Sequence, residues 1–136
     1  MDFMRSIFIA ATGLRAQSGR MRVIAENIAN ANSTAANSTT DPYRRRVPSF
    51  STSFDRDLQA TVVSMGRVRA DGSDFTVRNE PGHPAADQQG NVKYPNVNTL
   101  IETVDMREAQ RSYEANLNVI TATRRMIART IEILRA

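Results

Sequence analysis

Two long stretches free of proline, one at each end of the chain, constrain the fold most strongly. Residues 1–31 contain no proline, and residues 99–134 contain neither proline nor glycine. Because proline breaks helix interiors and glycine weakens them, both stretches are predicted helices. At 1.5 Å per residue they would extend ~38 Å and ~50 Å, which is long for so small a chain.

Apolar residues recur every seven positions in both stretches, as expected of helices that pack along one narrow stripe. We predict that these stripes form an assembly interface. Its residues are Ile7, Leu14, Met21, Ile24, Ile28, Met106, Tyr113, Leu117, Ile120, Ile127, Ile131 and Leu134.

The two apolar stripes cannot both be fully buried within one chain. A lone pair of helices buries too little apolar surface to be stable. We therefore expect a mainly α fold with a small β-rich insert, in which the long N- and C-terminal helices pair in a coiled-coil-like bundle on assembly. Other copies of the chain are the first expected partners.

The region between the helices has a different composition. Residues 32–41 are rich in Asn, Ser and Thr, whose side chains compete for backbone hydrogen bonds and favour turns, so they are a predicted polar linker. In 42–98, β-branched and aromatic runs alternate with Gly and Pro, which is typical of short strands and turns. The expected segments are 1–31 (N-terminal assembly helix), 32–41 (linker), 42–98 (β-rich region, with strands near 47–54, 60–65, 67–70 and 75–78) and 99–136 (C-terminal assembly helix).

Residue types that carry chemistry are scarce. The chain has no cysteine and one histidine, His83, which lies in a proline-flanked turn. These counts argue against a thiolate metal cluster or a Cys nucleophile, and a general base would need a second titratable group nearby. The six glycines are scattered rather than gathered in a phosphate-binding loop. We expect no enzyme activity, no catalytic residues, no cofactor and no metal.

Arginine dominates the positive charge and leaves a second function open. The net charge is +4, and basic clusters lie at 43–47 and 123–130. A small nucleic-acid-binding protein that uses its Arg-rich C-terminal helix is the alternative hypothesis. Interleaved glutamates and the lack of aromatic residues for base stacking favour solvated faces or ion pairs between subunits instead. We expect neither nucleic-acid binding nor direct lipid binding.

The uncharged apolar run of residues 6–14 is too short to span a membrane, which takes ~20 residues. Arginines follow it where a signal peptide would have a small-residue cleavage site. We expect it to be part of the first helix, and any export to use a route other than a cleaved signal.

Several strings, in the right order along the chain, resemble the flagellar rod and hook axial proteins. They are ATGLRAQSGRMRVIAENIANANS (11–33), DPYRRR (41–46), PGHPAADQQGNVKYPNVN (81–98) and RSYEANLNVI (111–120). Thr12 stands where that family usually has Ser, and 26–30 supply the Asn-rich half of its N-terminal signature. Residues 47–80 match no pattern of the family. The other strings are most similar to its proximal-rod members.

This resemblance implies a structural subunit of the proximal rod, the drive shaft of the bacterial flagellar basal body. It implies export through the flagellar type III apparatus and helical assembly through the terminal helices in the periplasmic part of the rod. The implied partners are other copies of the chain, other rod proteins, the membrane-ring adaptor at the rod base and the export apparatus.

Overall fold

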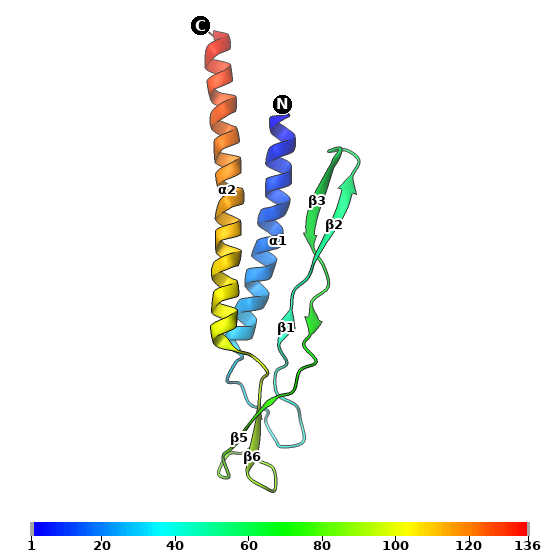
Figure 1. Cartoon of the computed structure of the whole chain (residues 1–136), viewed down its shortest axis with the longest axis vertical. Helices are drawn as coiled ribbons and strands as arrows, with labels where there is room; N and C mark the ends of the chain where they lie inside the picture. The colour runs from blue at the N-terminus through cyan, green and yellow to red at the C-terminus, as the bar shows by residue number, and fades with distance from the viewer. Residues whose placement is uncertain (1, 136) are drawn as a thin grey trace. The chain divides into compact units, whose positions relative to one another are not determined.

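A computed structural model describes residues 2–135, in which a small β region follows one long helix and precedes another along the chain (Figure 1). Helix α1 spans Phe3–Ala29 and helix α2 spans Thr99–Arg135. The strands are β1 (Arg46–Val47), β2 (Phe50–Asp55), β3 (Ala60–Met65), β4 (Arg69–Ala70), β5 (Thr76–Asn79) and β6 (Asn91–Tyr94). The predicted fold class, mainly α with a small β-rich insert, is confirmed.

Short polar side chains set the helix ends. Asp2 Oδ1 accepts a hydrogen bond from the Arg5 amide, and Asn98 Oδ1 accepts one from the Leu100 amide. Each satisfies a backbone donor that has no partner inside the helix. At the other end of α1, the Asn30 side chain bonds back to the Glu26 carbonyl, and the Asn- and Ser-rich segment begins.

The chain forms two compact units, and each contains a part of both helices. Unit 1 comprises Met1–Met21, Ser49–Arg67 and Arg107–Ala136. Unit 2 comprises Arg22–Pro48 and Val68–Met106. The division into functional segments that the composition suggested remains a prediction.

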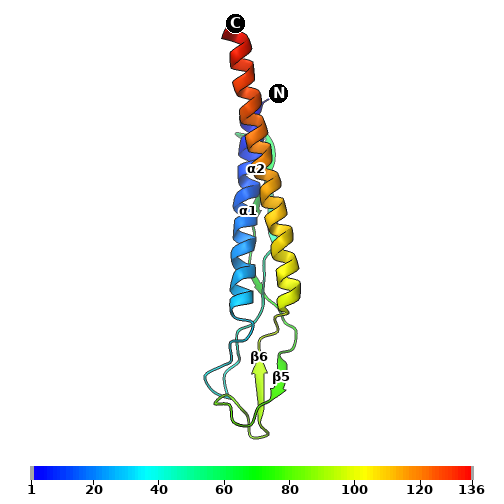
Figure 2. The same cartoon turned by 90° about the vertical axis from the view of Figure 1, so that its left-hand side faces the viewer.

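In unit 1 the two helices run antiparallel and approach each other at a glycine. Gly13 lies against Asn116, and a Cβ at Gly13 would be 2.8 Å from the Asn116 Oδ1. About two turns further along, Arg20 reaches Glu108 with 3.5 Å between guanidinium nitrogen and carboxylate oxygen. The residue numbers rise on α1 as they fall on α2, as an antiparallel pair requires. Figure 2 shows the two helices side by side from a second direction.

Unit 1 also holds the β2–β3 hairpin, in which Phe50 pairs with Met65 and Asp55 with Ala60. The Asp55 carboxylate accepts hydrogen bonds from the amides of Asp57 and Leu58, which fixes the turn. Met65 packs over Gly19 of α1, where any Cβ would meet its sulfur. The hairpin thus rests on a face of α1 that glycine keeps open.

Unit 2 holds two more antiparallel pairs, β1–β4 and β5–β6. The sequence suggested one strand over 47–54, but Pro48 lacks an amide hydrogen, and β1 ends before it. Strand β6 was not predicted, because Asn91 and Lys93 lower its β propensity. Its Val92 is nonetheless completely buried. Gly90 has a φ of 79° in the turn before β6, a conformation that glycine adopts without strain.

The buried side chains of the described residues are small. Alanine supplies five of the eight buried apolar residues, and the others are Val23, Ile24 and Val92. Three polar or charged residues are equally buried: Asn27, Glu102 and Thr123. The core is therefore aliphatic and modest, as the composition predicted, and it includes polar side chains.

We predict that Gly13→Ala destabilises the protein although alanine favours helix by about 1 kcal/mol. The new methyl group would displace the Asn116 side chain from its hydrogen bond with the Ser112 carbonyl. A loss of about 1 kcal/mol in the free energy of unfolding is expected, measured by urea denaturation. Adding Asn116→Ala should restore stability, and Gly72→Ala, which has open space around it, is the matched control. An equal response at Gly13 and Gly72 would contradict the close contact.

Candidate functional site

A fully buried asparagine on α1 organises unit 2. Asn27 is 0% exposed, and its amide makes four hydrogen bonds. Its Nδ2 donates to the Arg46 carbonyl at 2.8 Å and to Glu102 Oε2 at 2.9 Å. Its Oδ1 accepts from the Tyr43 hydroxyl at 2.8 Å and the Arg46 amide at 2.9 Å. The side chain thus replaces a neighbouring strand along one edge of β1 and joins α1 to α2.

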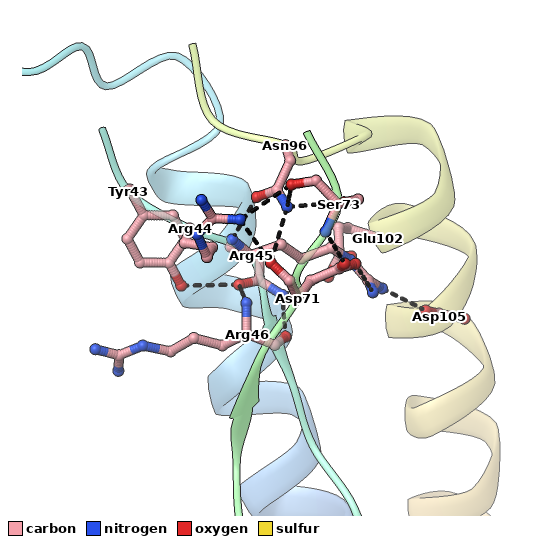
Figure 3. A network of polar contacts seen from close by, with 10 residues as sticks. Tyr43, Arg44, Arg45, Arg46, Asp71, Ser73, Asn96, Glu102 and Asp105 are labelled. Atoms are coloured by element: carbon pink, nitrogen blue, oxygen red, sulfur yellow. Dashed lines mark hydrogen bonds and ion pairs between the residues drawn. The ribbon is translucent and has the colours of Figure 1, made fainter. Parts of the chain in front are cut away.

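The partner on α2 is a buried carboxylate. Glu102 is 1% exposed, and its second oxygen, Oε1, accepts a hydrogen bond from Arg45 Nε at 2.7 Å. A buried charge is tolerated only when it is paired and hydrogen-bonded, and here both oxygens are. The guanidinium of Arg45 also reaches Asp71 at 3.4 Å and Asp105 at 3.9 Å. We call Asn27, Tyr43, Arg45, Asp71 and Glu102 the polar clasp, and Figure 3 labels the last four of them.

A second layer of contacts holds the segment after β4 against the clasp. The Asn96 amide nitrogen donates to the backbone carbonyls of Asp71 and Ser73, and its Oδ1 accepts from the Arg45 amide at 2.8 Å. Arg44 donates to the same two carbonyls while its guanidinium stacks 4.2 Å from the centre of the Phe75 ring. The clasp therefore connects four segments of unit 2 that are distant in sequence.

The clasp changes how its members titrate. A hydrogen bond from the Ser73 amide, assisted by Arg45, lowers the pKa of the Asp71 carboxyl below its ordinary value. Burial raises the pKa of the Tyr43 phenol, although the charge of Arg46 acts in the opposite direction. Tyr43 therefore keeps its proton at neutral pH and donates it to Asn27.

The twelve residues predicted for assembly fall into two groups. Most are buried or half-buried within the single chain: Ile7, Leu14, Met21, Ile24, Ile28, Met106, Tyr113, Ile120 and Ile127. Leu117, Ile131 and Leu134 are exposed. Leu134 and Ile131 lie on the last turns of α2, which in unit 1 continue past the first residue of α1 (Figure 1).

A second stripe on α2 was missed by the sequence analysis. Val119, Met126 and Ile133 are also seven apart, and they are 47%, 43% and 77% exposed. Each lies one residue before a member of the predicted stripe, about 100° around the helix. The heptad spacing could have revealed it, but spacing alone does not say which stripe the chain covers itself.

The arginines of 43–47 were expected to be solvated or to pair between subunits. Arg45 pairs with Glu102 within the chain, and Arg46 pairs with Glu26 at 3.1 Å while its side chain stays exposed. His83 accepts a hydrogen bond from the Ala85 amide on Nδ1 and thereby shapes its own turn. Over residues 2–135 no cluster of three or more metal-ligating side chains is found, and no helix is long and apolar enough to cross a membrane.

Known proteins resemble this chain along nearly its whole length. A family model described as flagella basal body rod protein matches residues 7–35, and one described as flagellar basal body rod FlgEFG protein C-terminal matches 88–133. The flagellar basal-body rod protein FlgC of Agrobacterium fabrum is 49% identical over 128 residues, covering 94% of this chain and 92% of that protein. The FlgC of Bacillus subtilis is 34% identical over 98% of this chain and 99% of its own, and that of Escherichia coli O157:H7 is 34% identical over 98% of each.

This chain belongs to the FlgC family. The two family models match the terminal parts, so Asn27 and Glu102 of the clasp lie in matched segments. Arg45 and Asp71 lie between them, in a region that the FlgC relatives cover but neither model does.

We predict that Asn27→Asp lowers the free energy of unfolding by about 3 kcal/mol. The substitution removes the donor to Glu102 and places a second carboxylate beside it. Adding Glu102→Gln should recover part of the loss, because donor and acceptor are then exchanged. Asn32→Asp makes the same change at an exposed position and is the control for urea denaturation. Equal losses at the two asparagines would show that the clasp contributes nothing.

The lowered pKa of the Asp71 carboxyl predicts that the free energy of unfolding decreases at acid pH. Since its pKa is lower in the folded chain, the ionised form contributes stability that is fully present above the ordinary value of 3.8 and is lost as the pH falls through the folded pKa. Thermal unfolding between pH 6 and pH 2 should therefore show a shallower acid decline for Asp71→Asn than for the unmodified protein. Asp57→Asn, in the β2–β3 turn, removes an equal charge outside the clasp. Parallel declines for all three proteins would contradict the assignment.

Proposed function

We propose that the chain is a structural subunit of the bacterial flagellar rod, in the basal body, and that it assembles through its two terminal helices. One observation carries the proposal: the 49% identity to a flagellar basal-body rod protein over 94% of the chain. Relatives of similar length in other bacteria have the same name, so the likeness extends over nearly all of this chain and not to one segment.

Exposed apolar side chains on α2 support assembly through this helix. Val119, Met126 and Ile133 form one stripe, and Leu117, Ile131 and Leu134 of the predicted interface lie beside it. Covering such side chains contributes roughly 25 cal/mol per Å² of apolar surface. In unit 2, Leu100, Ile101 and Val104 give the start of α2 a further exposed apolar patch.

The predicted interface residues then have two roles. The half-buried ones, such as Tyr113 and Ile120, hold α2 against its surroundings in the chain, while the exposed ones meet neighbouring subunits. Contacts of this kind are head-to-tail between copies and do not close, so the assembly grows as a helix. Long helices with many lateral contacts would give the rod the stiffness that torque transmission requires.

The finer proposals concern place and partners. The chain would occupy the proximal, periplasmic part of the rod after export by the flagellar type III apparatus. Its neighbours would be copies of itself, other rod proteins and the membrane-ring adaptor at the rod base. It would act without catalysis and without a cofactor, and the segments 1–31 and 99–136 would serve as the assembly helices, joined by the linker 32–41 and the β-rich region 42–98.

We predict that Val119→Asp abolishes rod assembly while the monomer keeps its stability. The side chain is exposed in the single chain, so a carboxylate costs little there but becomes a buried, unpaired charge in each assembled subunit. The measurement is swimming in soft agar by a flagellated strain whose own copy of the gene is deleted, with exported protein quantified by blot. Asn118→Asp, which adds the same charge at the neighbouring exposed position, should leave swimming intact.

Ile120→Asp provides the comparison for the inner stripe. It should lower the free energy of unfolding of the isolated protein, because Ile120 is already half-buried there. Normal swimming of cells with Val119→Asp would overturn the role of the outer stripe.

A further inference from the structure

Unit 2 contains a basic hollow, whose lining residues do not belong to the exposed apolar stripe of α2. It has a volume of about 530 Å³ and lies between the last turns of α1 and the β1–β4 pair. Four arginines line it: Arg22, Arg44, Arg46 and Arg69. The only carboxylate among its lining residues is Glu26. The lining therefore has a net charge of +3. Unit 2 as a whole, by contrast, contains eight acidic and seven basic side chains.

Three of these four positive charges have no ion pair among residues 2–135. Glu26 pairs with Arg46 at 3.1 Å. For Arg22, Arg44 and Arg69, the part of the chain from residue 2 to 135 provides no ion pair within 4 Å. Like charges gathered in a concavity repel each other, and a bound anion removes that repulsion.

Two of the arginines are held in place before any partner binds. Arg44 is fixed by the carbonyls of Asp71 and Ser73 and by the Phe75 ring, contacts that orient its guanidinium without cancelling its charge. The backbone of Arg46, in β1, is held by Asn27, and its guanidinium pairs with Glu26. Figure 3 shows the Arg46 side chain extending away from the clasp. Groups that are already ordered lose little conformational entropy on binding.

The walls of the hollow favour a protein segment over a nucleic acid. Val23, Val68 and Ala70 line it beside the arginines, and Val68 is 41% exposed. Single-stranded nucleic acids bind on open aromatic rings. Tyr43 is the one aromatic residue among the lining residues, and the Arg46 guanidinium lies 5.8 Å from its ring centre. Arginine pairs with carboxylates through two parallel hydrogen bonds, which suits Asp and Glu side chains.

We propose that this hollow is a docking site for an acidic segment of a partner protein, one that alternates carboxylate and apolar side chains. The carboxylates pair with Arg22, Arg44 and Arg69, and an apolar side chain covers the exposed Val68. The proposal goes beyond rod assembly through the helices and does not depend on it, because it uses residues of the β1–β4 pair and the end of α1.

The test is fluorescence anisotropy of the full chain with a short fluorescein-labelled peptide of alternating glutamate and leucine. A peptide with glutamine in place of glutamate should bind at least about tenfold more weakly, since charge-assisted bonds supply the affinity. Arg22→Gln with Arg69→Gln should also weaken binding about tenfold. Arg124→Gln with Arg125→Gln makes the same change of net charge on exposed turns of α2 and should leave binding within about twofold.

One variant gives an effect of the opposite sign. Glu26→Gln removes the carboxylate of the lining, which repels an acidic peptide and pairs with Arg46, and should tighten binding about threefold, which loss of folding would not do. If both double variants, that of Arg22 and Arg69 and that of Arg124 and Arg125, weakened peptide binding equally, the proposal would be overturned. The peptide would then respond only to the net charge of the protein. The proposal would also be overturned if a single-stranded oligonucleotide bound more tightly than the acidic peptide and if that binding depended on Arg22 and Arg69. The hollow would then be a nucleic-acid site.

Discussion

The amide of Asn27 is the interaction on which the arrangement of unit 2 depends. An asparagine side chain has two donor hydrogens and one acceptor oxygen, and here all of them are used at full burial. Because the partners lie on β1, on α2 and at Tyr43, no other side chain of this size satisfies them together. The buried Glu102 then requires Arg45, and Arg45 brings Asp71 and the segment after β4. Polar complementarity thus does what a large apolar core does elsewhere.

Placement of polar groups also separates the surfaces that the chain offers. In the clasp Arg45 is paired with Glu102, whereas Arg22, Arg44 and Arg69 line the hollow. On α2, stripes one residue apart have different surroundings, since Ile120 is half-buried and Val119 exposed. Unit 2 therefore carries the basic hollow and unit 1 the exposed stripe of Val119, Met126 and Ile133, each defined by the contacts that the chain already makes internally.

The sequence was sufficient for the helices and insufficient for the contacts. Absence of proline and heptad spacing predicted both helices, because these signals are local to each segment. The clasp joins residues far apart in sequence, and Asn27 within a predicted helix resembles any polar residue on a solvated face. Strand β6 was hidden by Asn91 and Lys93, and its assignment depends on pairing with β5. The strings DPYRRR and ENIAN carried the family likeness, yet they gave no indication that Tyr43 and Asn27 touch.

The small size of the buried residues has a thermal consequence. Exposing apolar surface raises the heat capacity on unfolding, and exposing polar surface lowers it. A chain that buries mainly alanine together with Asn27, Glu102 and Thr123 gains little heat capacity when it unfolds. The plot of its free energy of unfolding against temperature is therefore only weakly curved, so stability falls nearly linearly on heating instead of passing through a pronounced maximum.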